Sequence, residues 1–101
     1  MPLAETSSEG GLVAARVIVR GRVQGVYFRS SVKQQADIRG VRGWVRNNAD
    51  GSVEALLQGP REAVSEVAAW MRAGPRGSRV DSTDVEWLNE DEPFAGFDIV
   101  G

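Results

Sequence analysis

Cysteine and histidine are both missing from this chain of 101 residues. Without cysteine there are no disulfides, thiolate nucleophiles or thiolate metal ligands. Without histidine there is no Ser-His-Asp triad, no His-ligated zinc and no side chain that ordinarily titrates near neutral pH. Any catalysis must therefore use Arg, Asn, Ser, Lys, carboxylates or the backbone.

Long apolar runs are missing as well, since no stretch approaches the roughly 18 apolar residues of a membrane span. Residues 1–11 have neither the basic nor the apolar region of a secretory signal, and their Ser, Glu and Gly content is typical of a mobile tail. Hydrophobic residues at 42% and charged residues at 26% are an ordinary balance for a folded domain. We expect residues 12–101 to form one domain of a cytoplasmic protein.

Charge is unevenly spread along the sequence, although the net charge is only −2. Residues 12–46 hold eight bases against one acid, a net +7, whereas residues 47–101 hold four bases against eleven acids, a net −7. The first of these segments is suited to meet an anion. A nucleic-acid partner would usually require an overall basic chain, so we expect none.

Hydrophobic periodicity predicts an alternation of strands and helices. Glycine, proline and an Asn-Ala-Asp-Gly turn separate these segments. The expected strands are 13–19, 42–47, 53–58 and 80–88, with a short edge strand at 97–100. The expected helices run from Phe28 to Gly40 and from Gly59-Pro60, with Pro60 in the first helical position, to Gly74-Pro75.

The order strand, helix, strand, strand, helix, strand is that of ferredoxin-like βαββαβ sandwiches, an α/β (α+β) class with a mostly antiparallel sheet and both helices on one face. In this topology the first and second strands run parallel, with the third between them. The loop after the first strand and the end of the second therefore emerge at the same sheet edge. We expect a site made from both.

The segment after the first strand has the composition of an anion-binding loop. Its glycines let consecutive N–H groups point into one concavity, and a helix start follows with the positive end of its dipole. Arg29 stands in the first helical turn, where the dipole mildly disfavours a cation, so pairing with phosphate oxygens would explain it. A solvated surface arginine is the alternative. The loop comprises Gly21, Arg22, Val23, Gln24, Gly25 and Val26.

Several other polar residues could take part in chemistry. Asn47 ends the second strand, and its amide could orient a water, although local chemistry alone favours a turn residue. Ser30 and Ser31 lack a base that would activate them. The tryptophans are expected to pack, and the acidic segment 84–92 to be solvated rather than to hold a cation.

Two motifs resemble the acylphosphatase family of small hydrolases. The run Val19-Arg20-Gly21-Arg22-Val23-Gln24-Gly25-Val26-Tyr27-Phe28-Arg29 is similar to the family's first motif. Gly43-Trp44-Val45-Arg46-Asn47, followed at the expected spacing by Gly51, Val53 and Gly59, is similar to the second. Two differences stand out: Asn48 replaces a frequent Thr, and Val100-Gly101 replaces a basic and an aromatic residue.

The resemblance implies hydrolysis of the carboxyl-phosphate bond of acyl phosphates, with no metal and no cofactor. Arg29 and the backbone of residues 21–26 would bind the phosphoryl group, and Asn47 would hold the attacking water. It implies a small-molecule acyl phosphate as substrate and inorganic phosphate as product. We expect no membrane partner, and a monomer. The alternative is a non-catalytic acylphosphatase-like module that binds an anionic ligand or a partner domain.

Overall fold

The computed structural model describes residues 12–89 and 92–101. The expected tail at residues 1–11 and the middle of the acidic loop, residues 90–91, lie outside this range. In the described residues the strands are β1 (Val13–Arg22), β2 (Arg42–Asn47), β3 (Val53–Gly59), β4 (Arg79–Leu88) and β5 (Phe97–Ile99), and the helices are α2 (Phe28–Arg39) and α3 (Arg61–Ala73). The expected element order is confirmed.

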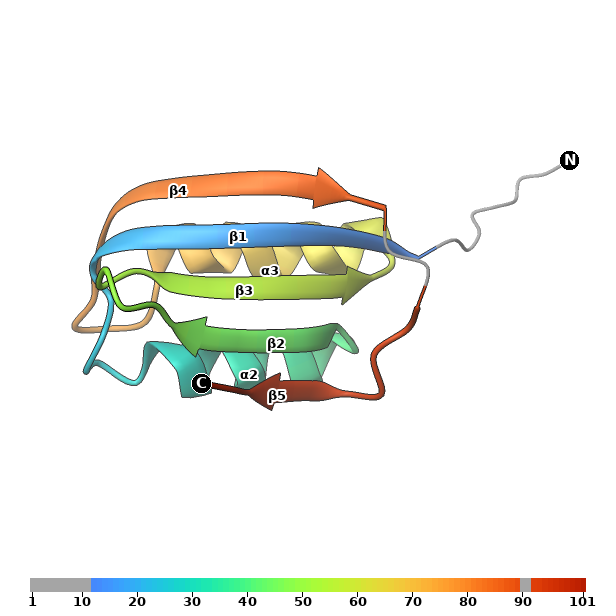
Figure 1. The fold of residues 1–101 in the computed structure, drawn as a ribbon, viewed down its shortest axis with the longest axis horizontal. Coiled ribbons are helices and arrows are strands. Elements are labelled where there is room, and N and C mark those ends of the chain that lie inside the picture. The colour runs from blue at the N-terminus through green and yellow to red at the C-terminus, as the bar shows by residue number, and fades with distance from the viewer. Residues whose placement is uncertain (1–11, 90–91) are drawn as a thin grey trace, which may run out of the picture.

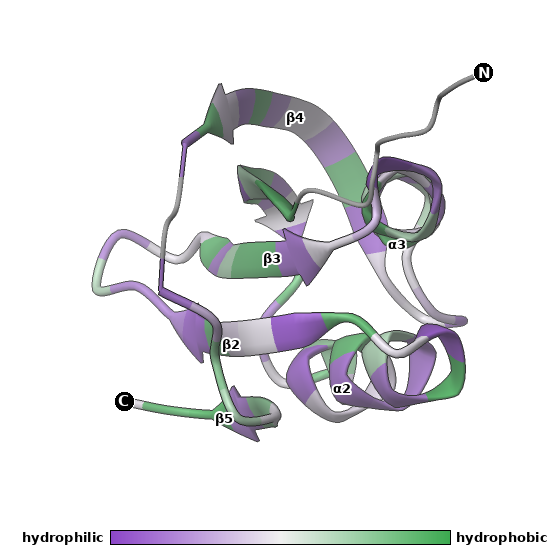
Figure 2. Ribbon diagram, turned by 90° about the vertical axis from the view of Figure 1, so that its right-hand side faces the viewer, coloured by the Kyte–Doolittle hydropathy of each residue, from purple (hydrophilic) through white to green (hydrophobic). Residues whose placement is uncertain are grey.

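The strands form a single sheet within the described chain, in the order β4-β1-β3-β2-β5. β3 pairs antiparallel with both β1 and β2, so β1 and β2 run parallel on either side of it, as the sequence predicts. β5 adds to β2 in parallel. Both helices lie on the same face of the sheet (Figures 1 and 2). The architecture is therefore a two-layer, ferredoxin-like α+β sandwich.

The core lies between that sheet face and the helices. Val17 and Val19 of β1 are fully buried, whereas Arg16 before them and Arg20 after them are exposed, which is the alternation of a half-covered strand. In α2 the buried side chains are those at four-residue spacing, Phe28, Val32 and Ala36. Phe28 meets Trp70 of α3 edge to face, with ring centroids 6.0 Å apart.

β1 is longer than the sequence suggests. Gly21 and Arg22, expected in the loop, continue the strand and pair with Val80 and Arg79 of β4, after a register shift between Arg20 and Gly21. Gly21 has a φ of 134°, and a Cβ there would collide with the carbonyl oxygen of Arg79. This glycine is therefore required for close strand packing, and the connecting loop is residues 23–27.

Two further expectations on element ends are corrected. Pro60 is the N-cap of α3, not its first helical residue, with an extended ψ of 143°. The edge strand ends at Ile99, although the N–H of Val100 still donates to the carbonyl oxygen of Val45 at 2.9 Å. Within the described residues no helix is long and apolar enough to cross a membrane.

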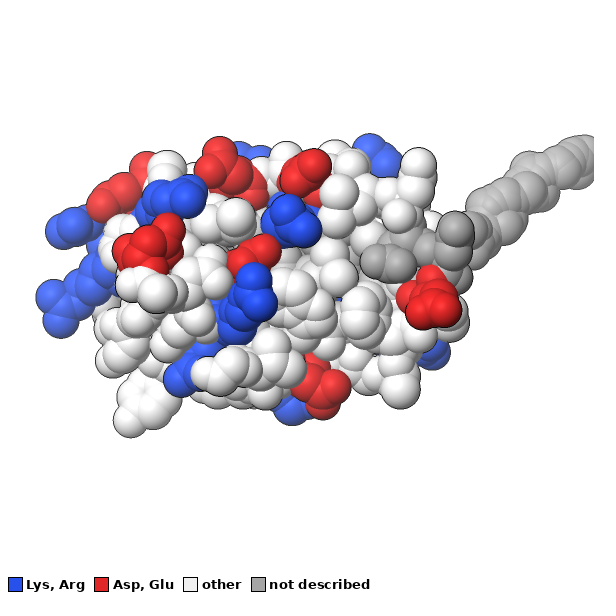
Figure 3. All heavy atoms as spheres, in the orientation of Figure 1, with Lys and Arg blue, Asp and Glu red and all other residues white. Residues whose placement is uncertain are grey.

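The separation of charge along the sequence disappears in the fold. β1 lies between β3 and β4, so its arginines face acids from the other half of the chain, and both signs are interleaved on the sheet face away from the helices (Figure 3). The ion pairs that join the two halves are Arg16 with Glu54 and Glu86, Arg20 with Asp50 and Asp84, Arg39 with Glu66, and Arg46 with Glu54.

Candidate active site

The loop that joins β1 to α2 is built around two left-handed residues. Gly25 has a φ of 76°, and Tyr27, the N-cap of α2, has a φ of 60°. Among the described residues no side chain caps the start of α2, and its first turn carries no acid. The first backbone N–H groups of a helix have no partner within it. This end of α2 is therefore a place where donors and the positive end of the dipole are available to an anion.

Asn47 lies at the facing end of β2, where it pairs with Val53 of β3. Its Oδ1 atom is buried, and no hydrogen-bond donor among the described residues reaches it. A buried carbonyl-type oxygen without a donor is costly, since it loses water without gaining a partner. The Oδ1 atom of Asn47 therefore keeps an unused capacity to accept a hydrogen bond.

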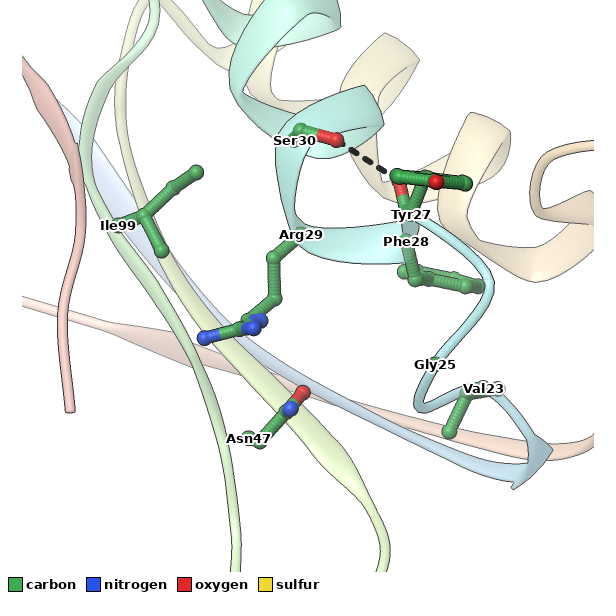
Figure 4. A pocket seen from close by; sticks show the side chains of 8 residues that line it. All are labelled: Val23, Gly25, Tyr27, Phe28, Arg29, Ser30, Asn47 and Ile99. Carbon is green, nitrogen blue, oxygen red and sulfur yellow. Dashed lines mark hydrogen bonds between the residues drawn. The ribbon is translucent and has the colours of Figure 1, made fainter.

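A pocket of about 350 Å³ lies between these two features. Arg29 reaches into it from the start of α2 and directs its guanidinium toward Asn47, while Ile99 borders it from β5 (Figure 4). The pocket thus joins one cation, one amide and one loop at a single end of the sheet. Its lining residues are Val23, Gly25, Tyr27, Phe28, Arg29, Ser30, Asn47 and Ile99.

The residues of the predicted loop have different positions. Val23 and Gly25 line the pocket together with Arg29 and Asn47. Gly21 and Arg22 belong to β1, as described above. Val26 packs against the core. The remaining residue, Gln24, turns its side-chain amide to the β2–β3 turn and donates to the carbonyl oxygens of Asn48 and Ser52.

Sequence reasoning missed the contributions of Tyr27, Phe28 and Ile99 to the pocket. Tyr27 is 84% exposed at the mouth, and an exposed aromatic residue inside a glycine-containing loop was a usable signal. Ile99 comes from the far end of the chain, and its place depends on the parallel pairing of β5 with β2. Lys33 of α2 holds β5 there, since its Nζ donates to the carbonyl oxygen of Phe97 at 2.8 Å.

The other candidates have ordinary structural surroundings. Ser30 Oγ donates to the backbone carbonyl oxygen of Tyr27 at 3.2 Å. Asn48 turns away from the pocket, since its Nδ2 donates to Ser52 Oγ at 3.0 Å. In the described part of the acidic segment, as elsewhere in residues 12–89 and 92–101, no three Asp or Glu side chains gather as a metal-ligand set.

Charge near the pocket is of two kinds. Arg29 forms no ion pair with any described residue, whereas Arg20 approaches Asp50 at 3.9 Å in the β2–β3 turn. Asp50 accepts hydrogen bonds from the hydroxyl and the backbone N–H of Ser52, and these bonds, together with the charge of Arg20, hold the pKa of Asp50 below its usual value. The Asp50 carboxylate is thus already paired with Ser52 and Arg20. Arg29, without an ion pair among the described residues, can bind an anion.

These features define the class of protein: a ferredoxin-like α+β sandwich with a small pocket, holding one arginine and one amide side chain, between a glycine-containing loop and the end of a neighbouring strand. The family model described as Acylphosphatase matches residues 15–99. An acylphosphatase of Pyrobaculum calidifontis is 48% identical over 95 residues, which is 93% of this chain and 86% of that protein. The chain belongs to the acylphosphatase family.

Solved structures agree with this membership. The crystal structure of acylphosphatase from Bacillus subtilis matches with a TM-score of 0.85 and 39% identity, covering 88% of this chain and 99% of that one. Full-length HypF, in a phosphate- and nucleotide-bound form, matches with a TM-score of 0.82 and 26% identity. That match covers 90% of this chain but only 12% of HypF, so the same fold also occurs within a much larger protein.

Proposed function

We propose that this protein hydrolyses the carboxyl-phosphate bond of acyl phosphates, releasing a carboxylate and inorganic phosphate. Membership of the acylphosphatase family supports the reaction. A pocket of about 350 Å³ suits a small ligand, because pockets for drug-sized molecules start at about this volume. The roles of Arg29, the loop and Asn47 are part of the same proposal.

The phosphoryl group binds between Arg29 and the loop. The Arg29 guanidinium can form paired hydrogen bonds with two phosphoryl oxygens. Backbone N–H groups of the loop and of the uncapped start of α2 supply further donors. These donors are fixed before the substrate arrives, so they stabilise charge on the phosphoryl oxygens in the transition state with little reorganisation.

The attacking water is held by Asn47, and the position of its amide in the same pocket as Arg29 is the observation that carries the proposal. A water in the pocket donates one hydrogen bond to Oδ1, which turns an oxygen lone pair toward the phosphorus. Asn47 and Arg29 line the same pocket, so water and phosphoryl group meet there. An amide stays neutral, and it orients the water without taking a proton.

The chemical step needs little acid-base help. The water oxygen attacks phosphorus, the bond from phosphorus to the carboxyl oxygen breaks, and the carboxylate leaves with the bonding electron pair. A carboxylate is a good leaving group that needs no proton, and a phosphoryl oxygen takes the proton from water. Positioning and charge stabilisation then supply the rate, as is general for phosphoryl transfer.

The test is release of phosphate from acetyl or benzoyl phosphate with EDTA present, comparing the parent chain with Asn47→Ala. We expect turnover by the parent that EDTA leaves unchanged, and loss of turnover in a variant that still binds phosphate. Circular dichroism controls for folding. A folded parent without turnover would contradict the proposal, and turnover abolished by EDTA would contradict its metal-free chemistry.

A second candidate function is a binding module without turnover. The match to HypF supports it, because there the same fold occupies 12% of a protein whose structure was solved with phosphate and nucleotide. In that case the pocket binds phosphate or another anion, and Asn47→Ala changes nothing that can be measured as turnover. Phosphate affinity in a parent that hydrolyses no acyl phosphate would favour this function.

We also propose that residues 12–101 act as one domain, as a monomer in the cytoplasm, with acyl phosphates as the only class of partner. Light scattering during size-exclusion chromatography tests the monomer, and cell fractionation tests the compartment. A dimer that buries the pocket mouth would contradict the first of these.

A further inference from the structure

The side chain of Gln24 joins the two halves of the site. It leaves the loop between β1 and α2, crosses to the turn between β2 and β3, and donates through Nε2 to the carbonyl oxygens of Asn48 at 2.9 Å and Ser52 at 3.0 Å. Both bonds span segments far apart in the sequence and are partly buried. They connect the proposed phosphate-binding loop directly to the residue that follows Asn47.

The turn on which Gln24 acts is well ordered by its own bonds. The N–H of Asn48 donates to the carbonyl oxygen of Ser52 at 2.8 Å, and the N–H of Gly51 donates to the carbonyl oxygen of Asn48 at 3.1 Å. The carbonyl oxygens that accept these bonds are the same two that accept from Gln24. Gln24 therefore binds the two carbonyl groups, of Asn48 and Ser52, whose hydrogen bonds close the turn. Asn47 immediately precedes the first of these residues.

A role for Gln24 as a phosphate ligand does not fit this geometry. A side-chain amide NH₂ group has two donors, and the two carbonyl oxygens use both. The remaining atom, Oε1, is an acceptor and cannot bind an anion. Only the backbone N–H of Gln24 can contribute to the loop, so its side chain has a different task.

We propose that Gln24 is a positioning residue that sets the distance between the bound phosphoryl group and the water on Asn47. This inference rests on the proposed function, since it assigns Arg29 and the loop to the phosphate and Asn47 to the water. Neither half of the site needs the other in order to bind its own ligand. In-line attack needs both at a fixed separation, and a misplacement of about 1 Å can cost about a hundredfold in rate.

The inference predicts that loss of the Gln24 amide affects turnover much more than phosphate binding. Removal of the Gln24 amide leaves Arg29 and the loop amides in place, so phosphate affinity changes by no more than about twofold. The rate of the chemical step falls, because the turn and Asn47 are no longer held against the loop. A residue with a merely structural role would lower stability and the amount of active protein, without this separation of binding from turnover.

The variant that tests this is Gln24→Met, which keeps the length and flexibility of the side chain but cannot donate. Gln24→Glu is a second variant of nearly the same shape, and its carboxylate faces the two carbonyl oxygens without a donor. Gln34→Met is the matched control, since Gln34 is exposed on α2 and outside the pocket. We expect kcat to fall roughly 10- to 100-fold in both Gln24 variants and to stay unchanged in the control.

A double-mutant cycle with Asn47→Ala then separates positioning from an independent effect. Gln24 acts through Asn47, so Gln24→Met should change the residual kcat of the Asn47→Ala chain by no more than about twofold. Single-turnover measurements at high protein concentration make this residual rate accessible. Equal losses of kcat in both backgrounds, or a loss of phosphate affinity that matches the loss of kcat, would overturn the inference.

Hydrogen exchange gives a readout that does not depend on activity. The backbone amides of Asn48 and Gly51 should exchange faster in Gln24→Met than in the parent, and at parental rates in Gln34→Met. If the parent shows no turnover, the proposed hydrolysis fails while this measurement still tests the contact. Unchanged exchange at both amides would show that Gln24 does not hold the turn.

Discussion

The guanidinium of Arg46 on β2 lies 2.9 Å from a carboxylate oxygen of Glu54 on β3, whose side chain is only 9% exposed. Arg16 on β1 reaches the other carboxylate oxygen at 3.3 Å. A carboxylate this well buried needs its partners, since an uncompensated buried charge is strongly destabilising. Glu54 therefore links the three central strands on the sheet face away from the helices.

The first prediction concerns this link. Arg46→Met should lower the free energy of unfolding by about 1 kcal/mol, because the arginine is half exposed and Arg16 remains to pair with Glu54. The double variant Arg16→Met/Arg46→Met should lose more than the sum of the single losses, because Glu54 is then left without a cation. Urea denaturation measures the unfolding free energy of all three variants. A loss in the double variant that equals the sum of the single losses would contradict the shared role of Glu54.

The second prediction concerns the cation in the pocket. Arg29→Ala should reduce both phosphate affinity and kcat/KM by at least about a hundredfold, since it removes a charged donor from the phosphoryl oxygens. Arg72→Ala is the matched control, because Arg72 is an exposed arginine in the last turn of α3. Isothermal titration with phosphate and the acyl phosphate assay measure the two quantities. If the two variants had the same phosphate affinity and the same kcat/KM, Arg29 would not belong to the phosphate-binding site.

The third prediction contrasts two glycines of the first motif. Gly21→Ala should cost about 1–3 kcal/mol in unfolding free energy, because its Cβ would press on the backbone of Arg79. At Gly25 an added Cβ has open space, so the cost comes from holding a non-glycine residue at the left-handed φ of 76°. This costs about 1–2 kcal/mol and destabilises the conformation of the loop. Gly25→Ala should therefore weaken phosphate binding, which thermal melts with and without phosphate would reveal as a smaller stabilisation by the ligand.

The fourth prediction concerns pH. The pKa of Asp50 is lowered in the folded state, first by the hydroxyl and the N–H of Ser52, so its contribution to stability is present above the usual carboxyl pKa. That contribution is lost as the pH falls through the lowered value. Asp50→Asn should therefore reduce the acid-side loss of stability between about pH 5 and pH 2. Urea midpoints measured across this range for both chains would test it, and parallel curves would contradict it.

Much of the fold could be predicted from the sequence, because its signals are local. The alternation around Val17, the four-residue spacing after Phe28 and the turn before Val53 each identify one element, and their order fixes the strand arrangement. The element ends were less predictable. Gly21 reads as a loop residue, yet it continues β1 because a neighbouring strand packs against its backbone.

The site was predictable only in part, for a similar reason. Arg29 and Asn47 belong to continuous motifs, and the topology brings them to one pocket. Ile99 reaches the same pocket through a pairing between β2 and the last strand that no local pattern encodes. Gln24 could be assigned to the loop from its motif, but the direction of its side chain depends on where the β2–β3 turn lies.

The place of β3 between β1 and β2 has a consequence for biosynthesis. Arg29 and Asn47 both precede β3 in the chain, yet the elements that carry them come into register only through that strand. During synthesis, Arg29 and Asn47 therefore exist before they can be brought together. The pocket forms only once residues 53–59 have been made and have paired between β1 and β2. Non-local strand pairing is the slow part of folding, so activity would appear only after the sheet is complete, not when its first strands form.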